Sequence, residues 1–236
     1  MGRLAAAIGA IALAFFAAAP VLHARADDQA FPAVRGNPAD RLANVPIDDF
    51  AYDFARKCTR YPKPGTLALE AWLGRHFGGV SWGIMRCEKL GSHHHYSLHA
   101  EGRALDWHLD VHEARDRAEA WRLIGMLLAP DRLGNPQALA RRMGMQEIIW
   151  DCQAWWSGSP VLVEYEPCYN KHGERRRHVN ETIAHRDHVH LGLNREGAAK
   201  HTSFWAGPLA ARHNPSLGHA ASNTNVQRGL KPKNRH

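Results

Sequence analysis

Apolar residues recur at helical spacing in segment 112–128, which predicts the longest helix of the chain. Its apolar positions follow one another at i, i+3, i+4 and i+7 and share one helix face: Ala120, Leu123, Ile124 and Leu127. Charged residues occupy the other side of this segment, and Pro130 follows its end. We therefore expect this helix to be the main cover of a sheet.

Two shorter helices are predicted nearer the N-terminus. In the first, Ile47–Cys58, the residues Phe50 and Phe54 are spaced as i and i+4, which indicates a buried helical stripe. The second, residues 66–76, begins at a threonine that can cap it and ends before a glycine pair. We expect both helices to be part of the scaffold of the fold.

Short apolar runs between polar turns predict the strands 80–86, 104–109, 147–151 and 187–193, with a further short one at 161–163. The elements follow in the order helix, helix, strand, strand, long helix, strand, strand. This order favours an α+β fold, in which helices cover one face of a small, mainly antiparallel sheet.

The first 26 residues have the pattern of an export signal. Residues 4–22 carry no charge, and Ala24-Arg25-Ala26 has the small-x-small form of a signal peptidase site. The alternative is an uncleaved membrane anchor, because the uncharged run approaches the length that spans a bilayer. We expect a cleaved signal peptide at 1–26 and a periplasmic or secreted protein with no membrane span after its removal.

Composition divides the rest of the chain into three parts. Residues 27–45 are polar and contain prolines, which predicts a flexible leader. Residues 46–206 are long enough for one domain with a sizeable core. Residues 207–236 are basic and poor in apolar side chains, so they cannot bury enough surface to fold and are predicted to be disordered.

The net charge of the chain is modestly positive. It is +7 for all 236 residues and falls to about +5 when the two arginines of the signal peptide are removed. Such a balance suits attraction to an anionic surface such as a bacterial wall. The sequence contains no groove-reading motif, so we expect no nucleic-acid partner, and a zinc phosphoesterase or nuclease is disfavoured.

Four cysteines in an exported chain indicate two disulfides, for which three pairings exist. We favour Cys58–Cys87 and Cys152–Cys168, because each then closes a loop within one half of the chain. A structural zinc site is the alternative, but no two cysteines have the CxxC spacing that such sites use.

Two distant segments carry residues that bind metal ions. The first runs Ser97-Leu98-His99-Ala100-Glu101-Gly102-Arg103-Ala104-Leu105-Asp106, and the second contains His188-Val189-His190. Side chains two apart on a strand point to the same face. Two imidazoles and one carboxylate leave one position of a catalytic zinc ion free for water. His99, Asp106 and His190 fit this set, and His188 is left as a base beside the metal.

Other histidines compete for these roles. His108 shares the expected strand face of Asp106 and is the main alternative ligand. His93, His94 and His95 are consecutive, so their side chains diverge and do not easily share one ion. We expect them to lie in a polar loop beside the site.

The two motifs resemble those of the zinc D-alanyl-D-alanine peptidases, in the secreted bacterial branch with an HxH second motif. The resemblance covers roughly residues 79–193. It implies the fold shared with lysostaphin-type peptidases and the hedgehog domain, with zinc on the sheet face opposite the helices. It also implies hydrolysis of amide bonds in peptidoglycan stem peptides. His188, which stands where some members of the family have a glutamate, is the expected base.

Two more residues are candidates for catalytic roles, His185 with support from the resemblance and Arg86 from the chemistry of its guanidinium. His185 lies three residues before His188 and is expected close to the metal, where it orients the substrate or stabilises the oxyanion. Arg86 is a candidate for holding a substrate carboxylate, with an ordinary solvated arginine as the alternative. Carboxypeptidase and endopeptidase action both stay open, as does a non-catalytic zinc-containing domain that binds the wall. We expect the protein to be a monomer.

Overall fold

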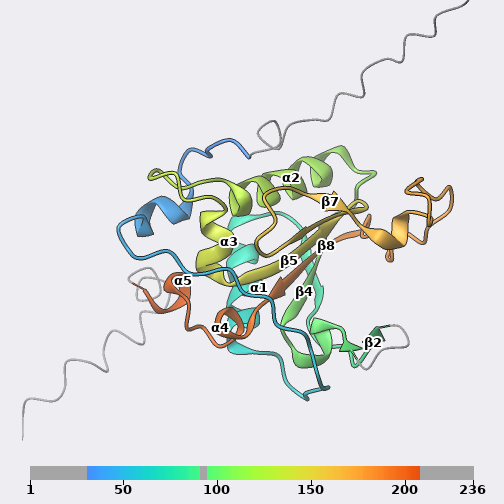
Figure 1. Cartoon of the computed structure of the whole chain (residues 1–236), viewed down its shortest axis with the longest axis horizontal. Helices are drawn as coiled ribbons and strands as arrows, with labels where there is room; N and C mark the ends of the chain where they lie inside the picture. The colour runs from blue at the N-terminus through green and yellow to red at the C-terminus, as the bar shows by residue number, and fades with distance from the viewer. Residues whose placement is uncertain (1–30, 91–94, 208–236) are drawn as a thin grey trace, which may run out of the picture.

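The computed structural model describes residues 31–90 and 95–207, and it has an α+β fold built on a six-stranded antiparallel sheet (Figure 1). The strands stand in the order β1-β4-β8-β5-β6-β7. Their bounds are β1 Val80–Gly83, β4 Ala104–His108, β5 Met145–Trp150, β6 Gln153–Trp156, β7 Val163–Glu164 and β8 His188–Leu193. A separate pair, β2 Lys89–Leu90 and β3 His95–Tyr96, projects from one corner (Figure 1).

The helices pack against one face of this sheet, as the sequence predicted. The α-helices are α1 Pro64–His76, α2 Ala114–Leu128, α3 Ala138–Met143, α4 Arg195–Ala198 and α5 Ser203–Ala206. The described residues also include the short 3₁₀ helices η2 Pro38–Leu42, η3 Leu98–Glu101 and η4 Glu166–Cys168. The apolar stripe of α2 is fully buried, as its spacing indicated. The α+β fold class is therefore confirmed.

Alternation along the strands separates the core from the polar face. Leu105 and Trp107 of β4, together with Val189 and Leu191 of β8, belong to the main apolar core. The residues between them, Asp106 on β4 and His188 and His190 on β8, therefore point to the opposite face. One face of the sheet thus holds the molecule together, and the other is available for chemistry.

Several predicted boundaries shift by a few residues. Helix α1 begins at Pro64, two residues earlier than expected, because proline is well suited to the first helical turn. Thr66 does not cap it. Its hydroxyl instead donates to the carbonyl oxygen of Gly102 at 2.8 Å, which ties α1 to the loop before β4. The strand expected at 80–86 ends at Gly83.

The helix predicted at Ile47–Cys58 is wrong, because this segment is extended. Its backbone groups bind side chains of the domain instead of one another. The backbone N–H of Asp53 donates to Gln146 Oε1 at 3.0 Å, and Arg103 donates to the carbonyl oxygen of Asp53 at 2.7 Å. The two aromatic positions that suggested a helical stripe are 39% and 59% exposed: Phe50 and Phe54.

Part of the leader predicted at 27–45 lies within the described residues and contains a short helix. Pro38–Leu42 forms η2, and Ala39 and Leu42 are buried in the main core. Asn37 caps this helix by accepting from the backbone N–H of Ala39 at 2.9 Å. These two apolar side chains, at the spacing of one helical turn, bury this part of the chain, and η2 packs against α3 and α5.

The predicted signal peptide and basic tail lie outside the described residues, apart from residue 207. Within residues 31–90 and 95–207, no helix is both long enough and apolar enough to cross a membrane. The two favoured disulfides, Cys58–Cys87 and Cys152–Cys168, are confirmed, with Cα–Cα distances of 5.4 and 5.6 Å. The first joins the extended segment to the loop after β1, and the second joins the β5–β6 turn to η4.

A buried ion pair holds the extended segment to the sheet. Arg103, which is 1% exposed, donates to Glu101 Oε2 at 2.9 Å and to the carbonyl oxygen of Leu193 at 2.7 Å. Burial alone raises the pKa of Glu101, but hydrogen bonds from the Arg56 N–H and from Arg103 outweigh it, so the pKa is lowered. The carboxylate is therefore charged and depends on its arginine.

We predict that Arg103→Met destabilises the protein by about 3–5 kcal/mol, because it leaves the buried Glu101 charge uncompensated. The measurement is the free energy of unfolding in urea. Arg115→Met, at an exposed arginine on α2, is the control and changes stability by about 0.5 kcal/mol or less. Adding Glu101→Gln to Arg103→Met should recover part of the loss. Equal unfolding midpoints for Arg103→Met and Arg115→Met would contradict the role of Arg103 as the partner of the buried Glu101 charge.

Candidate metal centre

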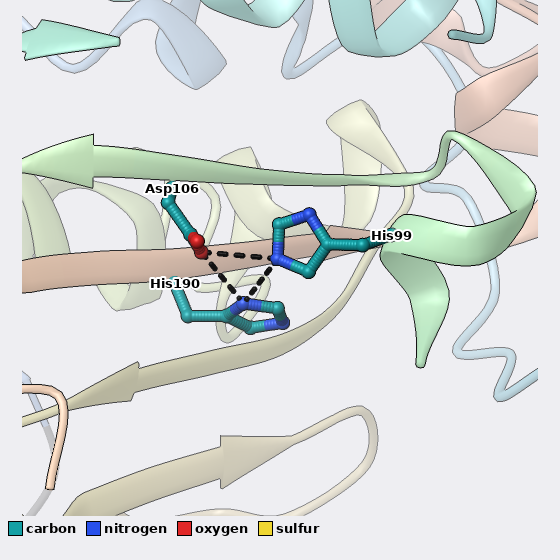
Figure 2. Close-up of side chains that lie close together, drawn as sticks. All are labelled: His99, Asp106 and His190. Carbon is teal, nitrogen blue, oxygen red and sulfur yellow. Dashed lines mark hydrogen bonds and ion pairs between the residues drawn. The ribbon is translucent and has the colours of Figure 1, made fainter. Parts of the chain in front are cut away.

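Three buried side chains from two distant segments meet on the polar face of the sheet: His99, Asp106 and His190. One donor atom of each lies within 4.8 Å of the other two, and the residues are 1%, 1% and 5% exposed. Figure 2 shows the two imidazoles and the carboxylate pointing toward a common centre. This is the set that the sequence predicted, and as a buried His-Asp-His group it can hold a metal ion.

Strand pairing brings two of the three together. Strands β4 and β8 are antiparallel neighbours, and Asp106 stands directly opposite His190 in their register. Directly opposed side chains on one sheet face are about 5 Å apart at Cβ, which is the spacing that two ligands of one ion require. The register itself therefore forms half of the site.

A tight reversal of the chain positions the third side chain of the triangle, that of His99. His99 lies on η3, which Ser97 caps by accepting from the His99 N–H at 3.3 Å. Gly102 ends η3 in the left-handed region, with a φ of 69°, and a Cβ there would lie 2.6 Å from the carbonyl oxygen of Tyr61. Gly102 therefore turns the chain back toward β4.

Each imidazole has a partner for its outer nitrogen. His99 Nδ1 lies 2.8 Å from the carbonyl oxygen of Ile84, and His190 Nε2 lies 2.8 Å from Glu147 Oε1. Because a carbonyl or carboxylate oxygen only accepts, these nitrogens carry the protons. The inner nitrogens, His99 Nε2 and His190 Nδ1, are then free to act as donors to a metal.

The inner atoms form a tight triangle that calls for a cation. His99 Nε2 lies 3.1 Å and His190 Nδ1 3.0 Å from Asp106 Oδ1, and the two nitrogens are 3.2 Å apart. Two lone pairs and a carboxylate at these distances repel one another unless a positive charge lies among them. Two nitrogen ligands and one oxygen ligand suit a divalent ion with one open position.

The pKa shifts of the three residues also indicate a site that suits a cation. Burial lowers the pKa of His99, whereas His190, despite its burial, has its pKa raised to about 9 by hydrogen bonds to Asp106 and Glu147. Burial of Asp106 is outweighed by hydrogen bonds with His190 and His99, which hold its pKa well below its usual range. The raised pKa keeps a second proton on His190 near neutral pH, which places positive charge beside the Asp106 carboxylate.

Arg86 touches the metal centre directly. Its Nη1 donates to Asp106 Oδ2 at 2.5 Å, while 47% of its side chain remains exposed. The alternative of an ordinary solvated arginine is therefore wrong for one end of the guanidinium. The other end borders the cleft above the site.

His188 lies beside the triangle without belonging to it. Its Nδ1 donates to Asp187 Oδ1 at 2.7 Å, and its Nε2 lies 3.4 Å from Asp106 Oδ1. On a regular strand, the side chain of Asp187 would point away from the site. It precedes β8 instead, and a hydrogen bond of 2.6 Å from Thr182 Oγ1 holds its carboxylate toward His188.

His185 completes this side of the site. Its ring lies 4.7 Å from the ring of His188 and 5.5 Å from that of His190, centroid to centroid. It has a φ of 52°, which turns the chain sharply before β8. Burial, together with His190 and His188, lowers its pKa well below the ordinary value, so this imidazole is neutral.

Among the competing histidines, His108 lies within the described residues and is not part of the triangle. His108 stacks on Trp82 with ring centroids 4.2 Å apart, and its Nδ1 donates to the carbonyl oxygen of Asp187 at 2.7 Å. His93 and His94 lie outside the described residues, and His95 belongs to β3. In the described part of the chain, the one His/Cys/Asp/Glu group that can hold a metal is the triangle itself.

Glu147 was missed by sequence reasoning. It was taken as one end of a buried strand, yet it is nearly buried and contacts both His190 and the hydroxyl of Tyr52. A carboxylate next to an apolar run was the signal, because charged side chains are rarely buried without a partner.

The metal centre opens into a cleft of about 1240 Å³. Aromatic side chains form much of its wall: Tyr52, Phe54, Tyr96, Trp156 and Tyr165. Trp155 is fully buried in the core, whereas Trp156 lies on the cleft.

We predict that His99→Ala and His190→Ala each lose tight metal binding, because two ligands cannot hold a divalent ion against buffer and water. Metal content after dialysis, measured by elemental analysis of the folded protein, tests this. His108→Ala is the control and retains the metal, since His108 faces Trp82. Retention of a full metal equivalent by His190→Ala would contradict the assignment.

Comparison with known families gives one match. The family described as "VldE, C-terminal domain" matches residues 59–180, a span that includes His99 and Asp106 and ends before His188 and His190. No curated protein and no solved structure matches the chain. The family is D-alanyl-D-alanine peptidase-like, which agrees in part with the resemblance seen in the sequence motifs. Because the match covers just over half of the 236 residues, the chain belongs to the VldE C-terminal domain family.

Proposed function

We propose that the protein is an exported zinc-dependent peptidase that hydrolyses amide bonds in peptidoglycan stem peptides. The observation that carries this proposal is the buried His99-Asp106-His190 triangle with a further oriented imidazole, that of His188, beside it. A binding site needs only the ligands. A hydrolase needs, in addition, a group that accepts a proton next to the ion.

Zinc is the ion that this donor set favours. Two imidazole nitrogens and one carboxylate oxygen, with a fourth position open, are the ligands of many catalytic zinc sites. When bound, zinc lowers the pKa of a water ligand toward about 7 and polarises the carbonyl group that is attacked. His99, Asp106 and His190 are the residues that would hold it.

His188 is the proposed base. Its Nδ1–H is held by Asp187, so the lone pair is on Nε2, the atom that lies 3.4 Å from Asp106 Oδ1 on the metal side. That nitrogen can take a proton from the attacking water and pass it to the leaving amine. Asp187 keeps the ring in this tautomer and stabilises its positive charge after the transfer.

Arg86 and His185 border the space in which the scissile amide would lie. The guanidinium of Arg86 is anchored at one end by Asp106, and its exposed end can bind an anionic oxygen in the cleft. His185 stands next to His188, and its neutral imidazole donates Nδ1–H to the carbonyl oxygen of Ile183 at 3.1 Å, so its Nε2 can accept a hydrogen bond from a substrate N–H. We assign substrate orientation to His185 and carboxylate or oxyanion binding to Arg86.

The cleft and the covalent structure support a peptide substrate outside the cytoplasm. A volume of about 1240 Å³ exceeds that of most small-molecule pockets, and a peptide of several residues fits it. Two disulfides are typical of oxidising compartments, which agrees with the signal peptide expected at 1–26. Peptidoglycan peptides are the substrate class that meets both conditions, and we propose no nucleic-acid partner.

We predict that His188→Ala retains zinc but loses hydrolysis of purified peptidoglycan by about 100-fold or more, because the proton acceptor is removed while the ligands stay. His190→Ala should lose both zinc and hydrolysis. The measurements are metal content and mass spectrometry of the released fragments, with His108→Ala as the control.

Two results would overturn this assignment. Wild-type rates for His188→Ala would show that another group is the base. Zinc-dependent binding to peptidoglycan without any release of fragments by the wild-type protein would instead support the non-catalytic wall-binding domain.

We also predict that Arg86→Gln discriminates between carboxypeptidase and endopeptidase action. If Arg86 holds a substrate carboxylate, kcat/KM for a stem peptide with a free C-terminus falls about 10-fold more than for the same peptide with a C-terminal amide. A loss of metal affinity would lower both values equally, so the ratio reports on carboxylate binding alone. An unchanged ratio would contradict this role of Arg86 and favour an endopeptidase.

A further inference from the structure

Among the described residues, Glu147 is the one carboxylate outside the metal triangle that contacts a member of it. It lies on β5, next to β8, and its Oε1 accepts from His190 Nε2 at 2.8 Å. Its other oxygen, Oε2, accepts from the hydroxyl of Tyr52 at 3.2 Å. Both oxygens are therefore occupied, one by the site and one by the extended segment that covers it.

The sheet makes room for this side chain. Gly192 stands opposite Glu147 in the β5–β8 register, in the middle of a fully buried strand. A Cβ on Gly192 would lie 2.5 Å from Glu147 Cγ and 2.9 Å from its Oε1. Glycine weakens a strand interior, so its presence there marks a close approach, in this case by the carboxylate that reaches His190.

Burial of this carboxylate is costly, and the Tyr52 hydroxyl compensates only one of its two oxygens. Glu147 is 8% exposed, and in the described part of the chain its ion-pair partner is His190 rather than a lysine or an arginine. An unpaired buried charge destabilises a fold by several kcal/mol. The contact with His190 is therefore the interaction that justifies a charge at this position.

Its effect on His190 is directional. By accepting the Nε2–H, Glu147 leaves Nδ1 as the nitrogen with a lone pair, and Nδ1 is the atom that lies 3.0 Å from Asp106 Oδ1. For His99 a backbone carbonyl, that of Ile84, has the same role, and no side-chain substitution can remove it. For His190 the choice of nitrogen depends on one replaceable side chain.

We propose that Glu147 is a positioning residue of the metal centre, which selects Nδ1 of His190 as the metal donor and raises the electron density of that imidazole. Tyr52 holds the second carboxylate oxygen through its hydroxyl, and all three side chains line the cleft. This inference rests on the proposed metal centre and concerns metal affinity, so it is separate from the peptidase activity.

The first test measures the dissociation constant for Zn²⁺ of the full chain, without substrate, by competition with a chromophoric chelator. Glu147→Ala should bind zinc about 10- to 100-fold more weakly than wild type, as for other partners of ligand histidines. Glu147→Gln should lie between the two, because its amide oxygen still accepts from Nε2–H but carries no charge.

Glu196→Gln is the matched control. Glu196 on α4 also accepts from a histidine, His201 Nδ1 at 3.0 Å, but this exposed pair is not part of the cleft. The same substitution should leave the dissociation constant at the wild-type value. Tyr52→Phe removes only the second hydrogen bond and should weaken zinc binding a few-fold, which keeps the test decisive if Glu147→Ala does not fold.

A spectroscopic readout separates positioning from mere stability. The visible d–d spectrum of the Co²⁺-loaded protein reports the geometry of the ligands, and it should change in Glu147→Ala and not in Glu196→Gln. Long-range ¹H–¹⁵N correlation of the zinc-loaded wild type should show His190 with its proton on Nε2. Zinc affinity and cobalt spectra of both Glu147 variants equal to wild type, or a proton on Nδ1, would overturn the inference.

The outcomes distinguish this inference from the proposed function. A wild-type protein that binds zinc with the expected dependence on Glu147, but releases no peptidoglycan fragments, supports the positioning role and overturns the peptidase. Cleavage of peptidoglycan with no dependence of zinc affinity on Glu147 does the reverse. A wild-type chain that binds no divalent metal overturns both.

Discussion

The antiparallel pairing of β4 with β8 is the constraint on which the rest of the molecule depends. It sets Asp106 opposite His190 and His108 opposite His188, and in the same register it sends Leu105, Trp107, Val189 and Leu191 into the core. A slip of one residue would move the metal ligands into the core and the apolar side chains to the cleft. The burial of the core residues thus also fixes the chemistry.

On the polar face of the sheet, carboxylates are paired with imidazoles and with an arginine. Asp106 is surrounded by His99, His190 and Arg86, and Glu147 and Asp187 hold the outer nitrogens of His190 and His188. Each carboxylate has a positive or proton-donating partner, as groups removed from water require. These contacts orient the imidazoles before any metal ion binds. Little conformational entropy is therefore lost when the ion orders its ligands.

The extended segment before α1 connects this polar face to the surface. It crosses the sheet end, where Arg103 and Gln146 bind its backbone, and it places Tyr52 over Glu147 and the aromatic wall along the cleft. The Cys58–Cys87 disulfide fixes its far end. Residues 47–58, whose spacing predicts a helix, therefore lie in an extended conformation beside the site, because side chains elsewhere in the fold bind their backbone groups.

Much of the fold was predictable from local patterns. The stripe of α2, the strands around Asp106 and His190, the two disulfides and the three members of the metal triangle all follow from spacing or from the resemblance of the two motifs. Such features depend on residues close in sequence, or on motif types whose chemistry limits the partners they can have. The helix predicted at 47–58 was wrong for the complementary reason: tertiary contacts, not local spacing, decide that segment.

By itself, the sequence determined which face of each strand is apolar, which helix covers the sheet, and which side chains have the chemistry to bind a metal. Only the tertiary structure decided that Glu147 holds His190, that Asp187 turns toward His188, that Arg86 rests on Asp106, and that His108 stacks on Trp82 instead of joining the ligands. The physical reason is that spacing along the chain specifies which face a side chain occupies. Its partner on that face is set by strand register and by loops, which bring together residues far apart in the chain.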